Sequence, residues 1–202
     1  MIPAAATKAL LLMLAVEACE FGSQIDTSYY ASQIEAESAW NINATFRTSR
    51  EFGAGLSQFT VAYHADGSVR FDTAAELRAK YKQELDEFKG AGLYDPRLAM
   101  RALILKDRDN YTLIQDAADQ RNRIAFTMAS YNAGSSLVRK DRLLCANTTG
   151  CDPAQWYSHT EKQGYQSKAR WQGYGQSAFD ITRSYVRKIE GKRFDYAAVF
   201  GA

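Results

Sequence analysis

Proline, histidine and cysteine are scarce in this chain of 202 residues, which contains three, two and three of them respectively. No histidine or cysteine pair has the spacing of metal ligands, so we expect neither a metal site nor another cofactor. Charge of one sign is also lacking: the formal net charge is +2 and the basic residues are dispersed, which argues against a nucleic-acid partner. The composition, 46% hydrophobic and 24% charged, is typical of a globular protein with one sizeable core.

The apolar run at 9–16 is too short to span a bilayer, so we expect no stable membrane insertion. A signal peptide is an alternative interpretation of this run, but the charged start is weak and no clear cleavage pattern follows. Pro3 and the apolar residues at positions 10, 11, 14, 15 and 18 favour a buried first helix instead. We therefore expect no clear signal peptide.

The three cysteines divide into a pair and a single residue. Cys145 and Cys151 bracket a five-residue loop that a disulfide can close, and such a bond would indicate an oxidising compartment. The sequence leaves open whether this pair is oxidised. Cys19 lies in an apolar helical segment and is expected to pack there as a small hydrophobic residue.

Hydrophobic periodicity indicates a mainly helical chain. Asp26 or Thr27 is expected to cap a helix that runs to about Trp40. The dipeptide Asp66-Gly67 lies between alternating segments and predicts a β-hairpin. Further helices are expected at 73–89, at about 96–107, at about 112–133 and from about 178, with an irregular, aromatic segment at 140–177. The expected fold is a mainly α single domain over 1–202 with a small β-hairpin.

Glu37 is the residue that we single out for catalysis. On a helix it shares one face with Tyr30, Gln33 and Ile34, which precede it by seven, four and three positions. A carboxyl group beside apolar and aromatic side chains tends to have a raised pKa. A raised pKa suits a general acid that works near neutral pH.

Three other polar residues near Glu37 are interpreted differently. A turn flanked by glycines is expected to bring Gln58 back toward the helix that carries Glu37. Glu35 is expected to solvate an exposed side of that helix, as most helical glutamates do. The lone His64 falls within the predicted hairpin and is expected to be a surface or packing residue.

Four motifs follow one another along the chain. They are Glu37-Ser38 with Trp40 after it, Gly55-Leu56-Ser57-Gln58, Ser130-Tyr131-Asn132-Ala133-Gly134, and Thr182-Arg183-Ser184-Tyr185-Val186. In this order they resemble the motifs of the catalytic domain of soluble lytic transglycosylases, whose fold is related to goose-type lysozyme. The resemblance covers nearly the whole chain and implies a lysozyme-like fold.

The chain also departs from the family pattern at several points. Ser57 stands where the family has Met, and Ile181 stands at an acidic position, with Asp180 one residue earlier. The loop between Trp40 and Gly53 is long, and the segment 61–89 resembles an insertion. Such departures are similar to those of phage-encoded members of the family.

The resemblance implies cleavage of the bond between N-acetylmuramic acid and N-acetylglucosamine without water, leaving a 1,6-anhydro sugar. A single carboxyl group, that of Glu37, would act first as acid and then as base, an exception to the rule of two carboxylates. The implied substrate contacts are Ser38, Ser57, Gln58, Tyr131, Asn132 and Tyr185. For Ser38 a plain role at the helix end is an alternative, and for both tyrosines core packing is one.

Two other functions stay open. A muramidase of similar fold would hydrolyse the same bond with a second acid, for which Glu51, Asp66 and Asp72 are candidates. A catalytically silent module that binds the wall or belongs to a virion is the other alternative. The expected partner is the peptidoglycan strand, the expected state is a monomer, and the expected setting is the bacterial periplasm or cell wall. Either a phage or a bacterial enzyme fits this setting.

Overall fold

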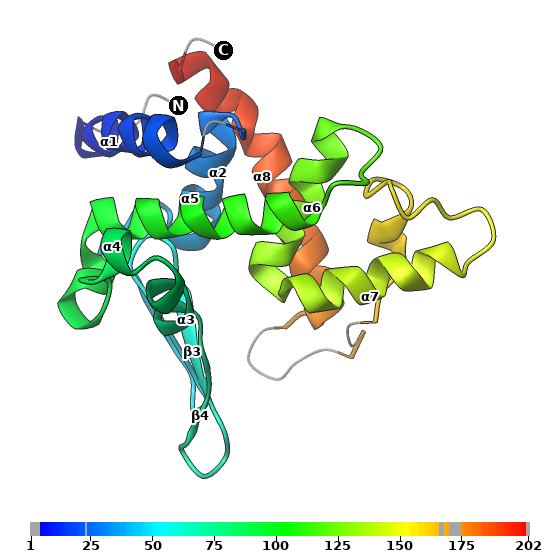
Figure 1. Ribbon diagram of the computed structural model, residues 1–202, viewed down its shortest axis with the longest axis horizontal. Helices are drawn as coiled ribbons and strands as arrows, with labels where there is room; N and C mark the ends of the chain where they lie inside the picture. The colour runs from blue at the N-terminus through cyan, green and yellow to red at the C-terminus, as the bar shows by residue number, and fades with distance from the viewer. Residues whose placement is uncertain (1–4, 23, 166–167, 170–174, 201–202) are drawn as a thin grey trace. The chain divides into compact units, whose positions relative to one another are not determined.

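The structure is a computed structural model that describes residues 5–22, 24–165, 168–169 and 175–200 (Figure 1). It is mainly helical and contains a small antiparallel sheet of four strands. The helices are α1 (Ala5–Phe21), α2 (Thr27–Ser38), α3 (Thr73–Lys80), α4 (Lys82–Leu85), α5 (Pro96–Leu113), α6 (Gln120–Ala133), α7 (Ser135–Ala146) and α8 (Ala178–Phe200), with 3-10 helices η1 (Gly90–Tyr94) and η2 (Thr160–Lys162). The strands are β1 (Thr45–Arg47), β2 (Glu51–Ala54), β3 (Phe59–Tyr63) and β4 (Val69–Asp72). Within the described ranges, no helix is long and apolar enough to cross a membrane.

The chain forms two compact units. The first contains residues 1–106 and 192–202, and the second contains residues 107–191. The boundaries fall inside α5 and α8, so both helices contribute residues to both units. Each unit has its own buried apolar residues, for example Leu56 in the first and Trp156 in the second. That 1–202 forms one domain stays a prediction.

The predicted first helix is confirmed as α1, which packs on α2 in the first unit. Its residues Leu11 and Leu14 are fully buried. Glu17 is buried on the same helix, where its carboxylate pairs with Nε of Arg97 at 2.5 Å and with Nε of Arg101 at 2.9 Å. This ion pair ties α1 to α5 within the first unit, because a buried carboxylate needs such partners.

The sheet is larger than the predicted hairpin. Its order is β1-β2-β3-β4, with Phe52 opposite Val61 and every neighbouring pair antiparallel. The hairpin at Asp66-Gly67 is confirmed between β3 and β4, and Ser68 N donates to Oδ1 of Asp66 across the turn at 2.9 Å. The strands β1 and β2 fall in a stretch that we interpreted as a polar loop, and that interpretation is wrong. The residues of β1 are all exposed, so no alternation of apolar and polar residues marks the strand.

The helix predicted over 73–89 is wrong as a single element. The chain leaves the helical conformation at Tyr81, between α3 and α4. Leu77, Leu85 and Phe88 are all buried on either side of this break, whereas Tyr81 is only half-buried. Whether 61–89 is an insertion stays a prediction.

Two further helix boundaries differ from prediction in the second unit. The helix α5 continues to Leu113, and α6 begins only at Gln120, so the single helix predicted over 112–133 is wrong. The carboxylate of Asp119 accepts from Asn122 N at 2.7 Å and caps α6, which explains why that helix starts there. The predicted inward residues of α6 are buried, among them Ile124 and Met128.

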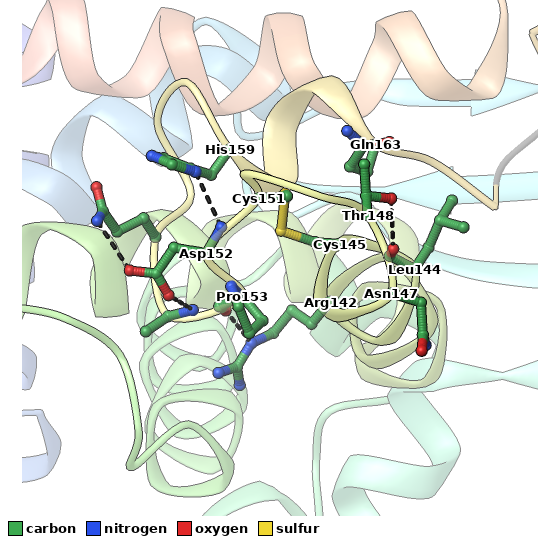
Figure 2. The surroundings of a disulfide bond; sticks show 12 residues. Arg142, Leu144, Cys145, Asn147, Thr148, Cys151, Asp152, Pro153, His159 and Gln163 are labelled. Carbon is green, nitrogen blue, oxygen red and sulfur yellow. Dashed lines mark hydrogen bonds between the residues drawn. A yellow bond between two sulfur atoms is a disulfide. The ribbon is translucent and has the colours of Figure 1, made fainter.

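The segment predicted to be irregular begins with a helix. Gly134 ends α6 with a φ of 86°, and α7 follows directly. The two helices are therefore joined by this single residue, and no loop in the sequence marks the start of α7. A disulfide joins Cys145 at the end of α7 to Cys151, with 5.2 Å between the Cα atoms, so the pair that the sequence left open is oxidised (Figure 2). Cys19 is exposed rather than packed, so the expectation that it packs as a small hydrophobic residue is wrong.

Candidate active site

Glu37 lies in the last turn of α2 and is partly exposed. The three residues that precede it on the same face, Tyr30, Gln33 and Ile34, are buried, so the apolar side that we predicted for it is present. Ser38 is also buried, and its hydroxyl donates to the carbonyl oxygen of Ile34 at 3.1 Å. This hydrogen bond lies within the last turn of the helix, and substrate contact by Ser38 stays a prediction.

The chain leaves α2 through a left-handed turn. Ala39 and Trp40 have φ angles of 50° and 63°, a conformation that residues other than glycine rarely adopt. Ala39 N donates to the carbonyl oxygen of Glu35 at 3.0 Å, and the indole Nε1 of Trp40 donates to the hydroxyl oxygen of Tyr196 at 2.7 Å. Two consecutive strained residues persist only where their surroundings hold them, and such residues concentrate at functional sites.

Glu35 is the anchor of this turn, and the expectation that it merely solvates the helix is wrong. Its Oε2 accepts from the hydroxyl group of Tyr196 at 2.5 Å, and its Oε1 lies 3.2 Å from Nζ of Lys192. Burial, followed by the hydrogen bond to Glu35, raises the pKa of Tyr196 well above its usual range, so the phenol stays protonated. The two partners come from the last part of α8, more than 150 residues away in sequence. No local pattern around Glu35 predicts them.

Gln58 braces the turn between β2 and β3. It has a left-handed φ of 47°, and its Nε2 donates to the carbonyl oxygens of Gly55 at 2.7 Å and Ala44 at 3.2 Å. A Cβ added to Gly53 would lie 3.1 Å from Oε1 of Gln58, so the amide also packs against that glycine. The side chain holds the turn closed and joins it to the start of β1.

Gly55 and Ser57 fit this turn against the rest of the first unit. Gly55 has a φ of 69°, and a Cβ there would lie 2.1 Å from the carbonyl oxygen of Leu93, so only glycine fits. Ser57 is fully buried, and its hydroxyl donates to the carbonyl oxygen of Ala99 in α5 at 3.0 Å. Because this hydroxyl faces α5, contact between Ser57 and a glycan would require the turn to move.

In the second unit, the structure brings the third and fourth motifs together. Asn132, in the last turn of α6, is exposed, and its Oδ1 accepts from the hydroxyl of Thr182 in α8 at 3.0 Å. Tyr131 beside it is half-buried, and Tyr185 on α8 is buried. The hydrogen bond orients the Asn132 amide so that its oxygen faces Thr182 and its nitrogen remains as a donor. Thr182 belongs to the fourth motif, but we did not predict its contact with Asn132.

Arg183, the residue after Thr182, has a structural role. It is buried and its Nη2 pairs with Oδ2 of Asp141 at 2.7 Å. Its Nε donates to the carbonyl oxygen of Glu161 at 3.1 Å, and Nη2 also donates to that of Gln163. The arginine therefore fixes the loop after α7 to α8. The sequence could have predicted this role, because Arg183 lies among apolar residues of a helix and a buried arginine needs a partner.

The predicted site residues divide between the two units. Glu37, Ser38, Ser57 and Gln58 lie in the first unit, and Tyr131, Asn132 and Tyr185 lie in the second. The arrangement of all seven as one site stays a prediction.

The aromatic residues at 156–174 have different environments. Trp156 is fully buried against Phe126, with ring centroids 5.6 Å apart, so it packs a core rather than a sugar. Tyr165 is exposed, whereas Trp171 and Tyr174 lie outside the described residues.

Two of the three candidate second acids have local structural partners. Oδ1 of Asp72 accepts from Ala75 N at 2.9 Å and caps α3. Asp66 accepts from both the backbone and the hydroxyl of Ser68, and these hydrogen bonds lower its pKa. Glu51 is a half-buried residue of β2. In the part of the chain that the structure describes, no three His, Cys, Asp or Glu side chains gather as metal ligands would.

Comparison with known proteins supplies no relative: no protein-family model matches the chain, and no curated protein matches its sequence at a significant level.

Proposed function

We propose that the chain is a peptidoglycan lytic transglycosylase that cleaves the β-1,4 bond between N-acetylmuramic acid and N-acetylglucosamine and leaves a 1,6-anhydro-muramyl end. The observation that supports this most is the position of Glu37. Its carboxylate stands at the edge of a buried face of α2 and directly before the strained turn at Ala39 and Trp40. A carboxyl group held at such an edge can be partly desolvated and still reach a substrate.

The reaction needs only one acid. The protonated Glu37 gives its proton to the glycosidic oxygen as the bond to C1 of the muramyl unit breaks. The resulting carboxylate then takes the proton of the C6 hydroxyl, whose oxygen attacks C1 and closes the anhydro ring. The acetamido group of the substrate supports the positive charge at C1, as in other reactions assisted by the substrate.

The supporting residues hold the parts of this site in place. Ser38 and Glu35 stabilise the end of the helix that carries Glu37, and Gln58 stabilises the neighbouring turn. The Asn132 amide, oriented by Thr182, is proposed to bind an acetamido or hydroxyl group of the glycan, together with Tyr131 and Tyr185. The proposed place of action is the wall of a bacterium, for an enzyme of phage or bacterial origin.

A hydrolytic muramidase is the second candidate function. It requires a second carboxylate to activate water, and the caps formed by Asp66 and Asp72 occupy two of the three candidates. Glu51, the third candidate, is a half-buried residue of β2. If the chain hydrolyses glycan, Glu51→Gln abolishes lysis, whereas the single-acid mechanism predicts that this variant keeps it.

Turbidity loss of purified wall suspensions tests whether Glu37 is the acid. The parent chain is expected to clear the suspension, and Glu37→Gln is expected to lose at least about 100-fold in rate, the range of general acid catalysis. Glu76→Gln, an exposed glutamate of α3, serves as the matched control and is expected to lyse normally. Equal lysis by Glu37→Gln would remove Glu37 from its role. Absence of lysis by the parent would favour a silent wall-binding or virion module.

A further inference from the structure

A cavity of about 580 Å³ lies in the second unit, and its wall includes none of the seven predicted site residues, although it includes Ser130, the neighbour of Tyr131. Its wall combines the end of α5, Ser130 of α6, residues along the whole of α7, and Pro153, which lies two positions after Cys151. The volume falls within the range of about 300–1,000 Å³ that is typical of small-molecule sites.

The wall of this cavity presents hydrogen-bond donors. Asn110 of α5 lines the cavity and is 3% exposed, and its Nδ2 has no hydrogen-bond partner among the described residues. A buried amide nitrogen without an acceptor is uncommon in proteins. Ser135 and Ser136 also line the cavity, and they form the first turn of α7, where backbone N–H groups point out of a helix. An acceptor on a bound molecule would satisfy these donors.

The charge of the wall is positive. Arg139, Arg142 and Asp116 are its ionised side chains, two cations and one anion, which leaves a net charge of +1. The guanidinium of Arg142 lies 2.9 Å from Oδ2 of Asp116 and lowers the pKa of that carboxyl, so Asp116 stays ionised and Arg142 stays paired with it. Arg139 is exposed, and the positive end of the α7 dipole adds to its field. An anion is therefore favoured.

Apolar side chains also line the cavity. Leu113 and Leu143 line it and are 69% and 53% exposed, an unusual degree for leucine. Val138 and Pro153 continue the apolar lining. A ligand that fits both parts of the wall carries an anion at one end and a short apolar body at the other.

We infer that this cavity is a binding site for a small carboxylate with a short apolar body, such as the free C-terminal end of a peptide with small apolar side chains. The carboxylate binds at the first turn of α7 beside Arg139, and a carbonyl oxygen of the ligand accepts from Nδ2 of Asn110. The apolar body packs between Leu113 and Leu143. This site does not depend on the proposed lytic activity.

The disulfide shapes one side of the site. Figure 2 shows Arg142 Nε donating to the carbonyl oxygen of Pro153, which lies two residues after Cys151, at 2.8 Å. Asp152 N, directly after Cys151, donates to Nδ1 of His159 at 2.9 Å. Because Pro153 lines the cavity, reduction of the disulfide is expected to loosen that wall and weaken binding.

Titration followed by two-dimensional ¹H–¹⁵N NMR tests the inference, with N-acetyl-alanyl-alanine as the probe. Saturable shifts are expected for the side-chain amide of Asn110 and the backbone amides of Ser135 and Ser136. The C-terminal amide of the same dipeptide is expected to bind roughly tenfold more weakly, because hydrogen bonds to a charged acceptor are the stronger ones. Butyrate distinguishes two possible sources of the carboxylate. If butyrate binds as tightly as the dipeptide, the site is one for simple carboxylic acids; if it binds more weakly, the site is one for peptide C-termini.

Two variants separate binding from folding. Arg139→Gln changes an exposed residue and is expected to weaken the dipeptide at least severalfold while the spectrum stays that of a folded chain. Lys140→Gln, the exposed neighbour that does not line the cavity, is expected to bind like the parent. Absence of saturable shifts in the parent, or equal binding of acid and amide, would overturn the inference.

Discussion

The hydroxyl group of Tyr196 donates a hydrogen bond of 2.5 Å to the carboxylate of Glu35 and accepts one of 2.7 Å from the indole of Trp40. One phenol thus holds both the helix end that carries Glu37 and the turn that follows it. Tyr196, Glu35 and Trp40 all belong to the first unit, although Tyr196 is near the end of the sequence. The proposed catalytic carboxylate therefore depends on residues far from it along the chain.

Tyr196→Phe is expected to destabilise the chain by about 1–3 kcal/mol, because the Trp40 indole then loses its acceptor and Glu35 one of its donors. Urea unfolding measures this loss. Tyr165→Phe, which changes a tyrosine that is 65% exposed, is the control and is expected to change stability by less than about 0.5 kcal/mol. Equal stability of Tyr196→Phe and the parent would show that the hydrogen bonds of Tyr196 do not hold the turn.

The same tyrosine makes stability depend on alkaline pH. Its pKa in the folded chain is raised above the ordinary value of 10.0, so its contribution is fully present below pH 10.0. Above that value the unfolded chain loses the phenol proton first, and stability falls as pH rises toward the pKa of the folded state. Urea unfolding measures this between about pH 9 and 11, a range that brackets the ordinary pKa of tyrosine. Over that range the free energy of unfolding is expected to fall more steeply for the parent than for Tyr196→Phe. Parallel losses would contradict the raised pKa.

Gly55→Ala is expected to destabilise the first unit by more than the roughly 1–3 kcal/mol that a left-handed φ alone costs, since a backbone clash adds to this strain. The added Cβ would lie 2.1 Å from the carbonyl oxygen of Leu93. Gly67→Ala is the matched control, because Gly67 has a φ of 84° with nothing within 4 Å of the added Cβ. Denaturant unfolding of both variants separates the clash from the backbone strain, and equal losses would mean that the turn at Gly55 yields easily.

Asp141→Asn is expected to cost about 3–5 kcal/mol, because it leaves the guanidinium of Arg183 buried without a countercharge. The Asp141 and Arg183 side chains are 2% and 4% exposed, and Oδ1 of Asp141 also accepts from Tyr165 N. Asp116→Asn breaks the same type of pair with Arg142 at an exposed aspartate and is expected to cost less than about 1 kcal/mol. A loss at Asp141 as small as that at Asp116 would mean that water reaches the pair.

Loss of the Cys145–Cys151 disulfide is expected to lower stability by about 2 kcal/mol, the chain-entropy value for so short a loop. Thermal unfolding of a double Cys145→Ser, Cys151→Ser variant measures this loss. Cys19→Ser, which changes the exposed free thiol, is expected to unfold like the parent. If reductant lowers the melting temperature of the double variant as much as that of the parent, the disulfide is not the stabilising element.

The features that the sequence predicts well are local ones. The cap at Asp26, the turn at Asp66-Gly67 and the pair Cys145 and Cys151 each depend on residues a few positions apart. Local hydrogen bonds and short loops leave a pattern in the sequence that does not need the rest of the fold.

The features that we missed depend on partners distant in sequence or on marginal signals. The residues around Glu35 in the sequence are those expected around an exposed glutamate. Only its contact with Tyr196 reveals its role. The strand β1 is short and exposed, so it has no alternation to detect. The break at Tyr81 lies between Leu77 and Leu85, whose helical spacing predicts one continuous face and so gives no sign of it.

Mass spectrometry of the glycan fragments released from purified peptidoglycan tests the central claim most directly. A single protonated Glu37 that recovers its proton from the C6 hydroxyl predicts 1,6-anhydro-muramyl ends from the parent chain and no release by Glu37→Gln. Fragments that end in reducing N-acetylmuramic acid, or undiminished release by Glu37→Gln, would contradict it.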